Sequence, residues 1–81
     1  MDPVKLVAAE IALTTANTVG LATVVRICNN SGGTVLLTRA NTGGTVGTAT
    51  IINGDTEYFE KVATDTFAAN AAVRAVAVAY R

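Results

Sequence analysis

The segment Val19–Asn30, VGLATVVRICNN, is the part of the sequence that most strongly indicates the fold. It is rich in β-branched residues, and its side chains fall into the period-2 pattern of a strand. One side of that strand would carry Val19, Leu21, Thr23, Val25 and Ile27. The run ends in Asn29-Asn30-Ser31-Gly32-Gly33, a composition typical of a turn. We therefore predict a strand over Val19–Cys28, central to a β-sheet.

The rest of the chain also favours strands. Further strand-like segments are Val4–Leu13, Thr34–Ala40, Val46–Ile52, Thr56–Val62 and Val73–Tyr80. For the first of these, a helix capped by Asp2 with Pro3 at its first position is the alternative. The pair Asn53-Gly54 indicates a hairpin, because both residues tolerate positive φ. The sequence thus predicts an all-β fold, a small antiparallel β-sandwich or barrel of about six to seven strands, forming one domain over residues 1–81.

Two features concern the connections between the strands. Residues 64–72 are expected to connect two strands, with Asp65 capping one short helical turn that holds Phe67 inward. Asparagine or aspartate also recurs every twelve residues, each time at a predicted chain reversal. These residues are Asn17, Asn29, Asn41, Asn53 and Asp65. The spacing is that of strand plus turn, or a coincidence on which the strand predictions do not depend.

Size and composition favour association with other subunits. The chain has 81 residues and is 51% hydrophobic, but most of that fraction is Ala and Val, which bury little area each. Cys28 is the only cysteine and histidine is absent, so neither a disulfide nor a zinc site is expected. Association is the remaining way for so small a core to gain stability. We expect a homo-oligomer that is most stable inside an assembly.

The charge balance argues against several kinds of partner. Six basic and six acidic residues give a net charge of zero, without the basic face that nucleic acids or anionic membranes attract. Apolar runs are shorter than the roughly 20 residues of a membrane helix. The start, Met1-Asp2-Pro3, does not resemble a secretory signal. Partners are therefore expected to be proteins, with no nucleic acid and no membrane.

No catalytic, cofactor-binding or metal site is expected. Without histidine the commonest general base is missing, and Cys28 has no partner to activate it. Glu57 and Glu60 would lie on opposite faces of their strand, so they do not form a general acid–base pair. An ion pair of Lys61 with Asp65, anchoring the loop that follows, is the preferred role for these two charges. We do not expect an enzyme.

Pairs of adjacent apolar residues suggest that the outer faces of the sheets are contact surfaces. These pairs are Val24-Val25, Leu36-Leu37, Ile51-Ile52 and Tyr58-Phe59. Neighbours in a strand face opposite sides, so one member of each pair faces outward, unless a bulge shifts the phase. Ordinary surfaces also carry apolar groups, and the arginines are either interface rim residues or simply solvated. The candidate interface residues are Val24, Arg26, Leu36, Arg39, Ile52, Tyr58 and Arg74.

Three stretches resemble a known family. They are Val25–Asn29 with the Ser-Gly turn that follows, Glu60–Thr66, and Val73–Ala75 with Val78–Tyr80. Together they are similar to the small all-β virion proteins of tailed bacteriophages, notably cyanophages. The resemblance implies a structural protein made in the host cytoplasm and located in the virion. Its partners would be other virion proteins, above all the major capsid protein.

Within that resemblance, a capsid decoration or cement protein is the leading hypothesis. The alternative within the virion is an adaptor or fibre-attachment protein of the neck or tail. The alternative from another class is a small carbohydrate-binding module, which is less favoured because the chain has no Trp and only two Tyr to form a sugar-binding platform.

Overall fold

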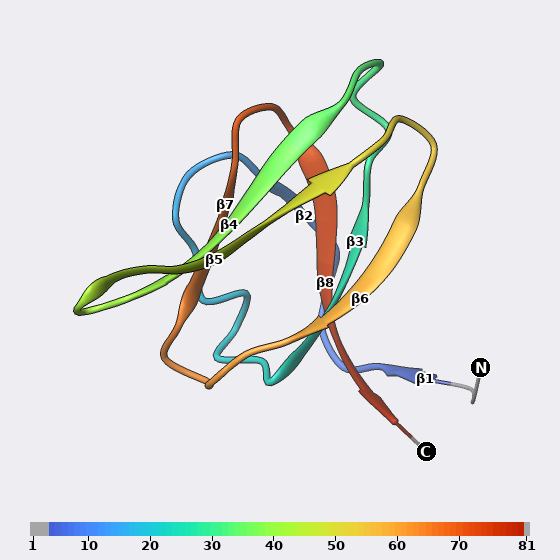
Figure 1. The fold of residues 1–81 in the computed structure, drawn as a ribbon. Coiled ribbons are helices and arrows are strands. Elements are labelled where there is room, and N and C mark those ends of the chain that lie inside the picture. The colour runs from blue at the N-terminus through green and yellow to red at the C-terminus, as the bar shows by residue number, and fades with distance from the viewer. Residues whose placement is uncertain (1–3, 81) are drawn as a thin grey trace.

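The computed structural model describes residues 4–80, which form eight strands in two antiparallel sheets that pack face to face (Figure 1). The strands are β1 (Val4–Leu6), β2 (Ile11–Leu13), β3 (Val24–Cys28), β4 (Val35–Asn41), β5 (Gly44–Ile51), β6 (Thr56–Glu60), β7 (Thr66–Ala69) and β8 (Val73–Tyr80). The predicted all-β fold of antiparallel sheets is confirmed. There are eight strands rather than six or seven, because the N-terminal segment divides into two strands and β7 is an additional one.

The chain passes repeatedly from one sheet to the other. The five-stranded sheet has the order β1-β8-β3-β6, with β2 pairing along the same edge of β8 as β1, and the three-stranded sheet has the order β5-β4-β7. The connections after β3, β5, β6 and β7 each change sheet, whereas β4 and β5 form a hairpin. Every sheet-changing connection has to satisfy its backbone polar groups without a ladder partner.

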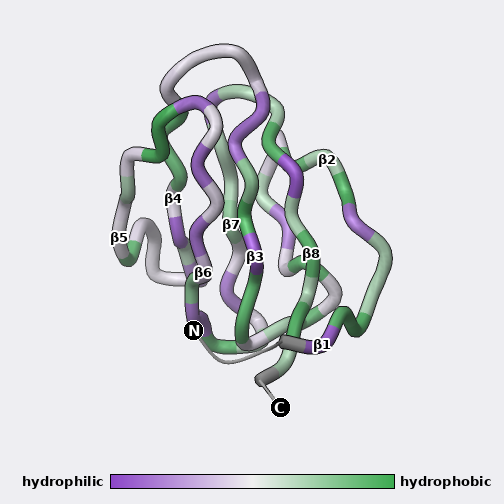
Figure 2. Tube along the Cα trace, turned by 90° about the vertical axis from the view of Figure 1, so that its right-hand side faces the viewer, coloured by the Kyte–Doolittle hydropathy of each residue, from purple (hydrophilic) through white to green (hydrophobic). Residues whose placement is uncertain are grey.

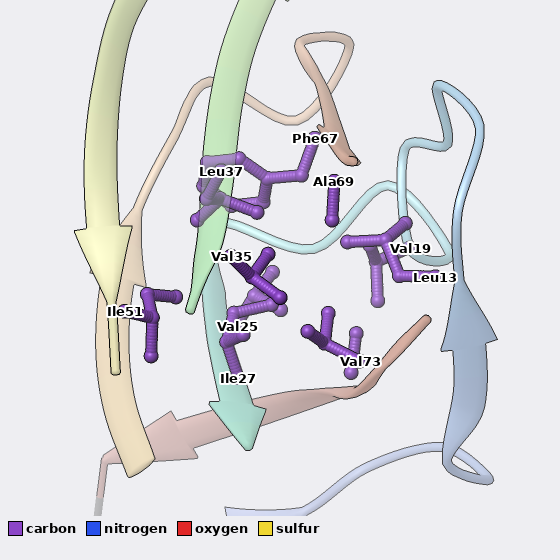
Figure 3. Packing of buried hydrophobic residues seen from close by; sticks show 11 residues of the cluster. Leu13, Val19, Val25, Ile27, Val35, Leu37, Ile51, Phe67, Ala69 and Val73 are labelled. Carbon is purple, nitrogen blue, oxygen red and sulfur yellow. The ribbon is translucent and has the colours of Figure 1, made fainter. Parts of the chain in front are cut away.

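The core lies between the two sheets and consists mainly of small apolar side chains (Figure 3). Its buried members are Leu13, Val19, Val25, Ile27, Val35, Leu37, Ile51, Phe67, Ala69, Val73 and Ala75. Within β3, Val25 and Ile27 are completely buried while the residues between and beside them are partly exposed, as a period-2 strand requires. The ring of Phe67 packs edge-on against that of Phe59, with centroids 6.0 Å apart.

The predicted strand over Val19–Cys28 is wrong in its first half. Strand β3 begins at Val24, and Val19, Gly20 and Leu21 have φ angles of 53°, 67° and 60°, which form a left-handed turn. The side chain of Asn17 directs this turn, because its Oδ1 accepts the Val19 N–H at 2.7 Å. Val19 is still only 5% exposed, so it is buried from a turn and not from a strand.

The predictions for the N-terminal segment and for residues 64–72 meet different outcomes. Strand rather than helix is confirmed for the first segment, as β1 and β2, while Asp2 and Pro3 lie outside the described residues. The helical turn after Asp65 is wrong, because Thr66–Ala69 pairs with β4 as strand β7. The inward position of Phe67 is confirmed, since this residue is 2% exposed.

The hairpin predicted at Asn53-Gly54 is also wrong. Gly54 does adopt a positive φ of 91°, but the turn leads from β5 in one sheet to β6 in the other. The local turn chemistry was therefore identified correctly, and the pairing of the flanking strands was not. A two-residue turn signal cannot distinguish a hairpin from a tight passage between sheets.

Asn29 joins the two sheet-changing connections at one end of the sandwich. Its side chain is fully buried, and its Nδ2 donates to the carbonyl oxygens of Ile51 (2.7 Å) and Gly33 (2.8 Å). Its Oδ1 accepts both the N–H and the hydroxyl of Ser31. The backbone of Asn29 bonds to the next connection as well, donating to the carbonyl of Asp55 and accepting from the Gly54 N–H. One amide thus satisfies polar groups from both connections.

We expect Asn29→Ala to lower the free energy of unfolding by about 2–4 kcal/mol, because the carbonyl oxygen of Ile51 loses a buried hydrogen bond and that of Gly33 loses a part-buried one. Urea unfolding followed by circular dichroism measures this change. Asn53→Ala is the matched control, since Asn53 is exposed and accepts a single bond from the Gly32 N–H, so a loss of about 0.5–1.5 kcal/mol is expected. Equal losses in the two variants would contradict the role of Asn29.

We expect Leu21→Asn to stabilise the chain by about 0.5–1 kcal/mol. Leu21 is 58% exposed and holds a left-handed conformation that costs a leucine about 1–2 kcal/mol, whereas asparagine tolerates it. The neighbouring Gly20→Ala is the opposite control. A Cβ there meets no atom within 4 Å, so its expected loss of about 1 kcal/mol comes from the backbone alone. The same unfolding titration tests both, and a destabilising Leu21→Asn would refute the strained turn.

Candidate functional site

Four of the seven candidate interface residues lie together on the outward side of the five-stranded sheet. In β3 the residues that alternate with the core are Val24, Arg26 and Cys28. Tyr58 is the neighbour of Arg26 across β6, and Arg74 is the neighbour of Cys28 across β8. Direct neighbours in an antiparallel ladder share a face. We call this surface the outer face, and it comprises Leu6, Val24, Arg26, Cys28, Tyr58, Arg74, Val76 and Val78.

An ion pair crosses the middle of the outer face. The guanidinium of Arg26 lies 3.5 Å from the carboxylate of Glu10. Arg26 is the β3 neighbour of Val76, and the register of β2 places Glu10 on the other side of the same valine. Such an exposed pair contributes only about 0–1 kcal/mol by itself. Val76 itself is 4% exposed although it points away from the core.

One end of the outer face is apolar and includes an exposed leucine. Val78 is 4% exposed and pairs with Leu6, while the register of β3 with β8 places Val24 on its other side. Leu6 itself is 72% exposed, and the adjacent Val7 is 57% exposed. Figure 2 shows a largely apolar β8 beside β3. A row of apolar side chains therefore ends in a leucine that the described residues, 4–80, leave largely exposed.

Leu36 and Ile52 lie on a different part of the molecule. Leu36 is on the outward side of the three-stranded sheet, opposite Thr50 of β5, and is 44% exposed. Ile52 follows β5 in the passage to β6 and is 56% exposed. In the adjacent pairs Leu36-Leu37 and Ile51-Ile52, the inward residues are Leu37 and Ile51, which are 2% and 1% exposed. Each of these two pairs thus has one apolar residue in the core and one in solvent.

Arg39 faces inward, in phase with Val35 and Leu37. Its guanidinium bonds the buried carboxylate of Asp65, with Nε and Nη2 at 2.8 Å and 2.7 Å from Oδ2. The predicted pair of Lys61 with Asp65 is therefore wrong in its cation. Lys61 is 5% exposed, and its Nζ donates to the carbonyl oxygens of Val62 and Ala63. The two charges do anchor the loop between β6 and β7, but through Arg39 and the backbone.

The sequence missed several members of the outer face. Val76 and Val78 lie two and four residues after Arg74, so an unbroken strand would place all three on the same face. That spacing could have identified both valines from the sequence. Glu10 had no such signal, because its place beside Arg26 depends on how β2 pairs with β8. Strand register, which the sequence does not encode locally, decided which residues meet.

Comparison of the sequence with models of protein families, with curated proteins and with solved structures gives no significant match. Within residues 4–80, the structure places no group of three or more Cys, Asp or Glu side chains where they would hold a metal ion. The described part of the chain also has no helix of the length and apolarity needed to cross a bilayer. The surfaces described above are what remains to indicate a function.

We expect the stability of the chain to rise with pH in the alkaline range because of Lys61. Burial holds the pKa of Lys61 below its ordinary 10.5, Asp65 opposes this shift, and Arg39 adds to it. The folded chain therefore releases this proton at a lower pH than the unfolded chain, and the free energy of unfolding rises with pH up to 10.5.

Urea unfolding from neutral pH up to 10.5, with the wild type and Lys61→Met compared, tests this expectation. The wild type should gain stability relative to the variant as the pH rises, and the comparison cancels the contributions of other groups. Lys5→Met is the matched control at an exposed lysine. Parallel profiles for the wild type and Lys61→Met would contradict a desolvated ammonium.

Proposed function

We propose that this chain is a structural protein of a tailed-bacteriophage particle, of the capsid decoration or cement type. It acts by contact alone, binding the assembled shell through the outer face of its five-stranded sheet. Its partner there is the major capsid protein, and it works as a homo-oligomer. The observation that carries the proposal is that large apolar side chains stand in solvent. Leu6 on the outer face is 72% exposed, Leu36 on the outward side of the three-stranded sheet is 44% exposed, and Ile52 after β5 is 56% exposed.

The energetics of these side chains support a contact role. Burying a leucine or isoleucine completely contributes about 1.5–3 kcal/mol, so a few such residues matter for a chain whose core is built mainly of valine and alanine. The arginines Arg26 and Arg74 stand among them on the outer face. Arginine is common in protein interfaces because it stacks and forms hydrogen bonds while burying its stem. The resemblance to small all-β virion proteins supports the same role.

Copies bound at many equivalent sites of a shell would reinforce it without any chemistry. An oligomer that engages two sites at once gains affinity from its second contact, because that contact is made at high effective concentration. A neck or tail adaptor would use the same kind of surface in far fewer copies. The number of chains per particle, measured by quantitative mass spectrometry, therefore distinguishes the two positions in the virion.

We expect Leu6→Asp to weaken binding to purified shells at least about tenfold, because a carboxylate at this position would be desolvated in the contact. Co-sedimentation of the purified chain with shells that lack it measures the binding. The matched control is Val62→Asp, which replaces a valine that is 59% exposed in the loop after β6, away from the outer face. Because Leu6 and Val62 are both exposed, both variants should fold as the wild type does.

Four results would overturn the proposal. Wild-type chain that does not co-sediment with shells would exclude the cement role, as would particles that lose no heat resistance without it. Equal binding by Leu6→Asp and wild type would exclude the outer face as the contact. Binding of the isolated chain to an array of glycans instead of shells would favour the carbohydrate-binding module.

A further inference from the structure

Most free sheet edges of this molecule carry a feature that prevents another strand from pairing with them. Unpaired N–H and C=O groups on an edge strand attract other chains, and proteins block them with charges, short strands or covering segments. Edge strand β6 carries Glu57 and Glu60. On the other edge of the same sheet, β1 and β2 are three residues each and are separated by a bend. These edges are protected by charge and by interruption.

The edge of β7 is covered by the chain itself. Asn17 forms an isolated bridge with Phe67, in which the N–H of each residue donates to the carbonyl of the other, at 3.0 Å and 2.9 Å. Strand β7 is also only four residues long. In the part of the chain that the structure describes, β7 therefore offers no free stretch long enough to pair with another strand.

Strand β5, at the opposite edge of that sheet, has no charged side chain, and no other strand within residues 4–80 pairs with its free edge. It spans eight residues, GTVGTATI, without a charged side chain or a proline, and six of the eight residues are exposed. Figure 2 shows it in white and green, without the purple of the glutamates on β6. An open groove of about 240 Å³ separates β5 from β6, so β6 does not cover the edge. In Figure 1 the tip of the β4–β5 hairpin extends beyond the other strands.

A bulge interrupts β5 only near the hairpin. Arg39 pairs with Gly47 and Ala40 with Thr45, so Val46 is the extra residue. From Gly47 to Ile51 the register with β4 is continuous. In an antiparallel ladder every second residue of an edge strand presents its N–H and C=O outward. A regular stretch of five residues is therefore available for pairing.

We propose that the free edge of β5 pairs antiparallel with β5 of a second copy of this chain, joining the two three-stranded sheets into one. In the symmetric register Ala49 lies opposite Ala49 of the second copy, and Thr48 lies opposite Thr50. Cross-strand threonine pairs are favourable neighbours. On the inward side, Gly47 has no side chain to oppose Ile51 of the second copy.

The second copy is the occupant because the strand is complementary to itself. Pairing β5 with β5 brings no charge opposite a like charge, whereas pairing with β6 would bury glutamates beside uncharged residues. The pairing has twofold symmetry, which is the commonest arrangement of soluble homo-oligomers and closes without forming fibres. The inference concerns the isolated chain, so it stands or falls independently of shell binding.

Sedimentation equilibrium of the purified chain and of two charged variants tests the proposal. We expect wild-type chain to dimerise. Thr48→Lys/Thr50→Lys and Thr48→Glu/Thr50→Glu should each dimerise at least about tenfold more weakly, because like charges would stand directly opposite each other. An equimolar mixture of the lysine and glutamate variants should form a heterodimer, which an unfolded variant could not do.

The matched control is Thr34→Lys/Thr64→Lys, which adds the same charge at two exposed threonines outside the strands and should dimerise as the wild type does. A wild-type chain that stays monomeric at the highest soluble concentration would overturn the proposal. So would a lysine variant that dimerises normally, since the contact would then lie elsewhere. Failure of the lysine and glutamate variants to associate when mixed would overturn the register.

Discussion

The buried amide of Asn29 is the interaction on which the stacking of the two sheets depends. Two connections pass between the sheets at the same end of the molecule, and neither has a ladder to satisfy its backbone groups. The Asn29 side chain donates to carbonyl oxygens in both, at Gly33 and Ile51, and so fixes one connection against the other. A core of mainly small side chains provides little area to hold the sheets in register by itself. The amide supplies a directional constraint that this core lacks.

The sequence predicted the fold class because burial alternates along most strands. The alternation grouped Val25 with Ile27 on one side of their strand without knowledge of the pairing, and the structure places that side in the core. It failed between Val19 and Thr23, where the backbone turns left-handed under the control of Asn17. Val19 is buried there, but Leu21 and Thr23, which the pattern placed on the same side, are exposed. A hydrogen bond from a side chain two residues away overrode the β propensity of the segment. Periodicity therefore indicates burial and strand geometry only where no local side chain redirects the backbone.

The candidate site was partly accessible from sequence for the same reason. Parity within β3 put Val24 and Arg26 on one side, but only the observed register shows that Tyr58 and Arg74 join them. Arg39 illustrates the converse. Arg39 lies two residues after Leu37 in the same strand, so it shares the inward face of that strand. Its partner Asp65 is 26 residues away in the chain, and nothing local indicated that this carboxylate would be buried beside it. Contacts between distant segments determine which charges are neutralised inside and which remain for partners.

A dimer paired through the β5 edge would determine how the outer faces of its two copies are oriented. Antiparallel strands in one sheet are related by a twofold axis perpendicular to that sheet, so residues directly opposite each other project to the same side. In a dimer joined through β5, the outer faces of both five-stranded sheets would therefore point in the same direction. A single flat or gently curved partner could then contact Leu6 and Arg74 of both copies at once. Self-association at the edge would convert one weak apolar contact into a bivalent one, while leaving the surface that makes the contact free.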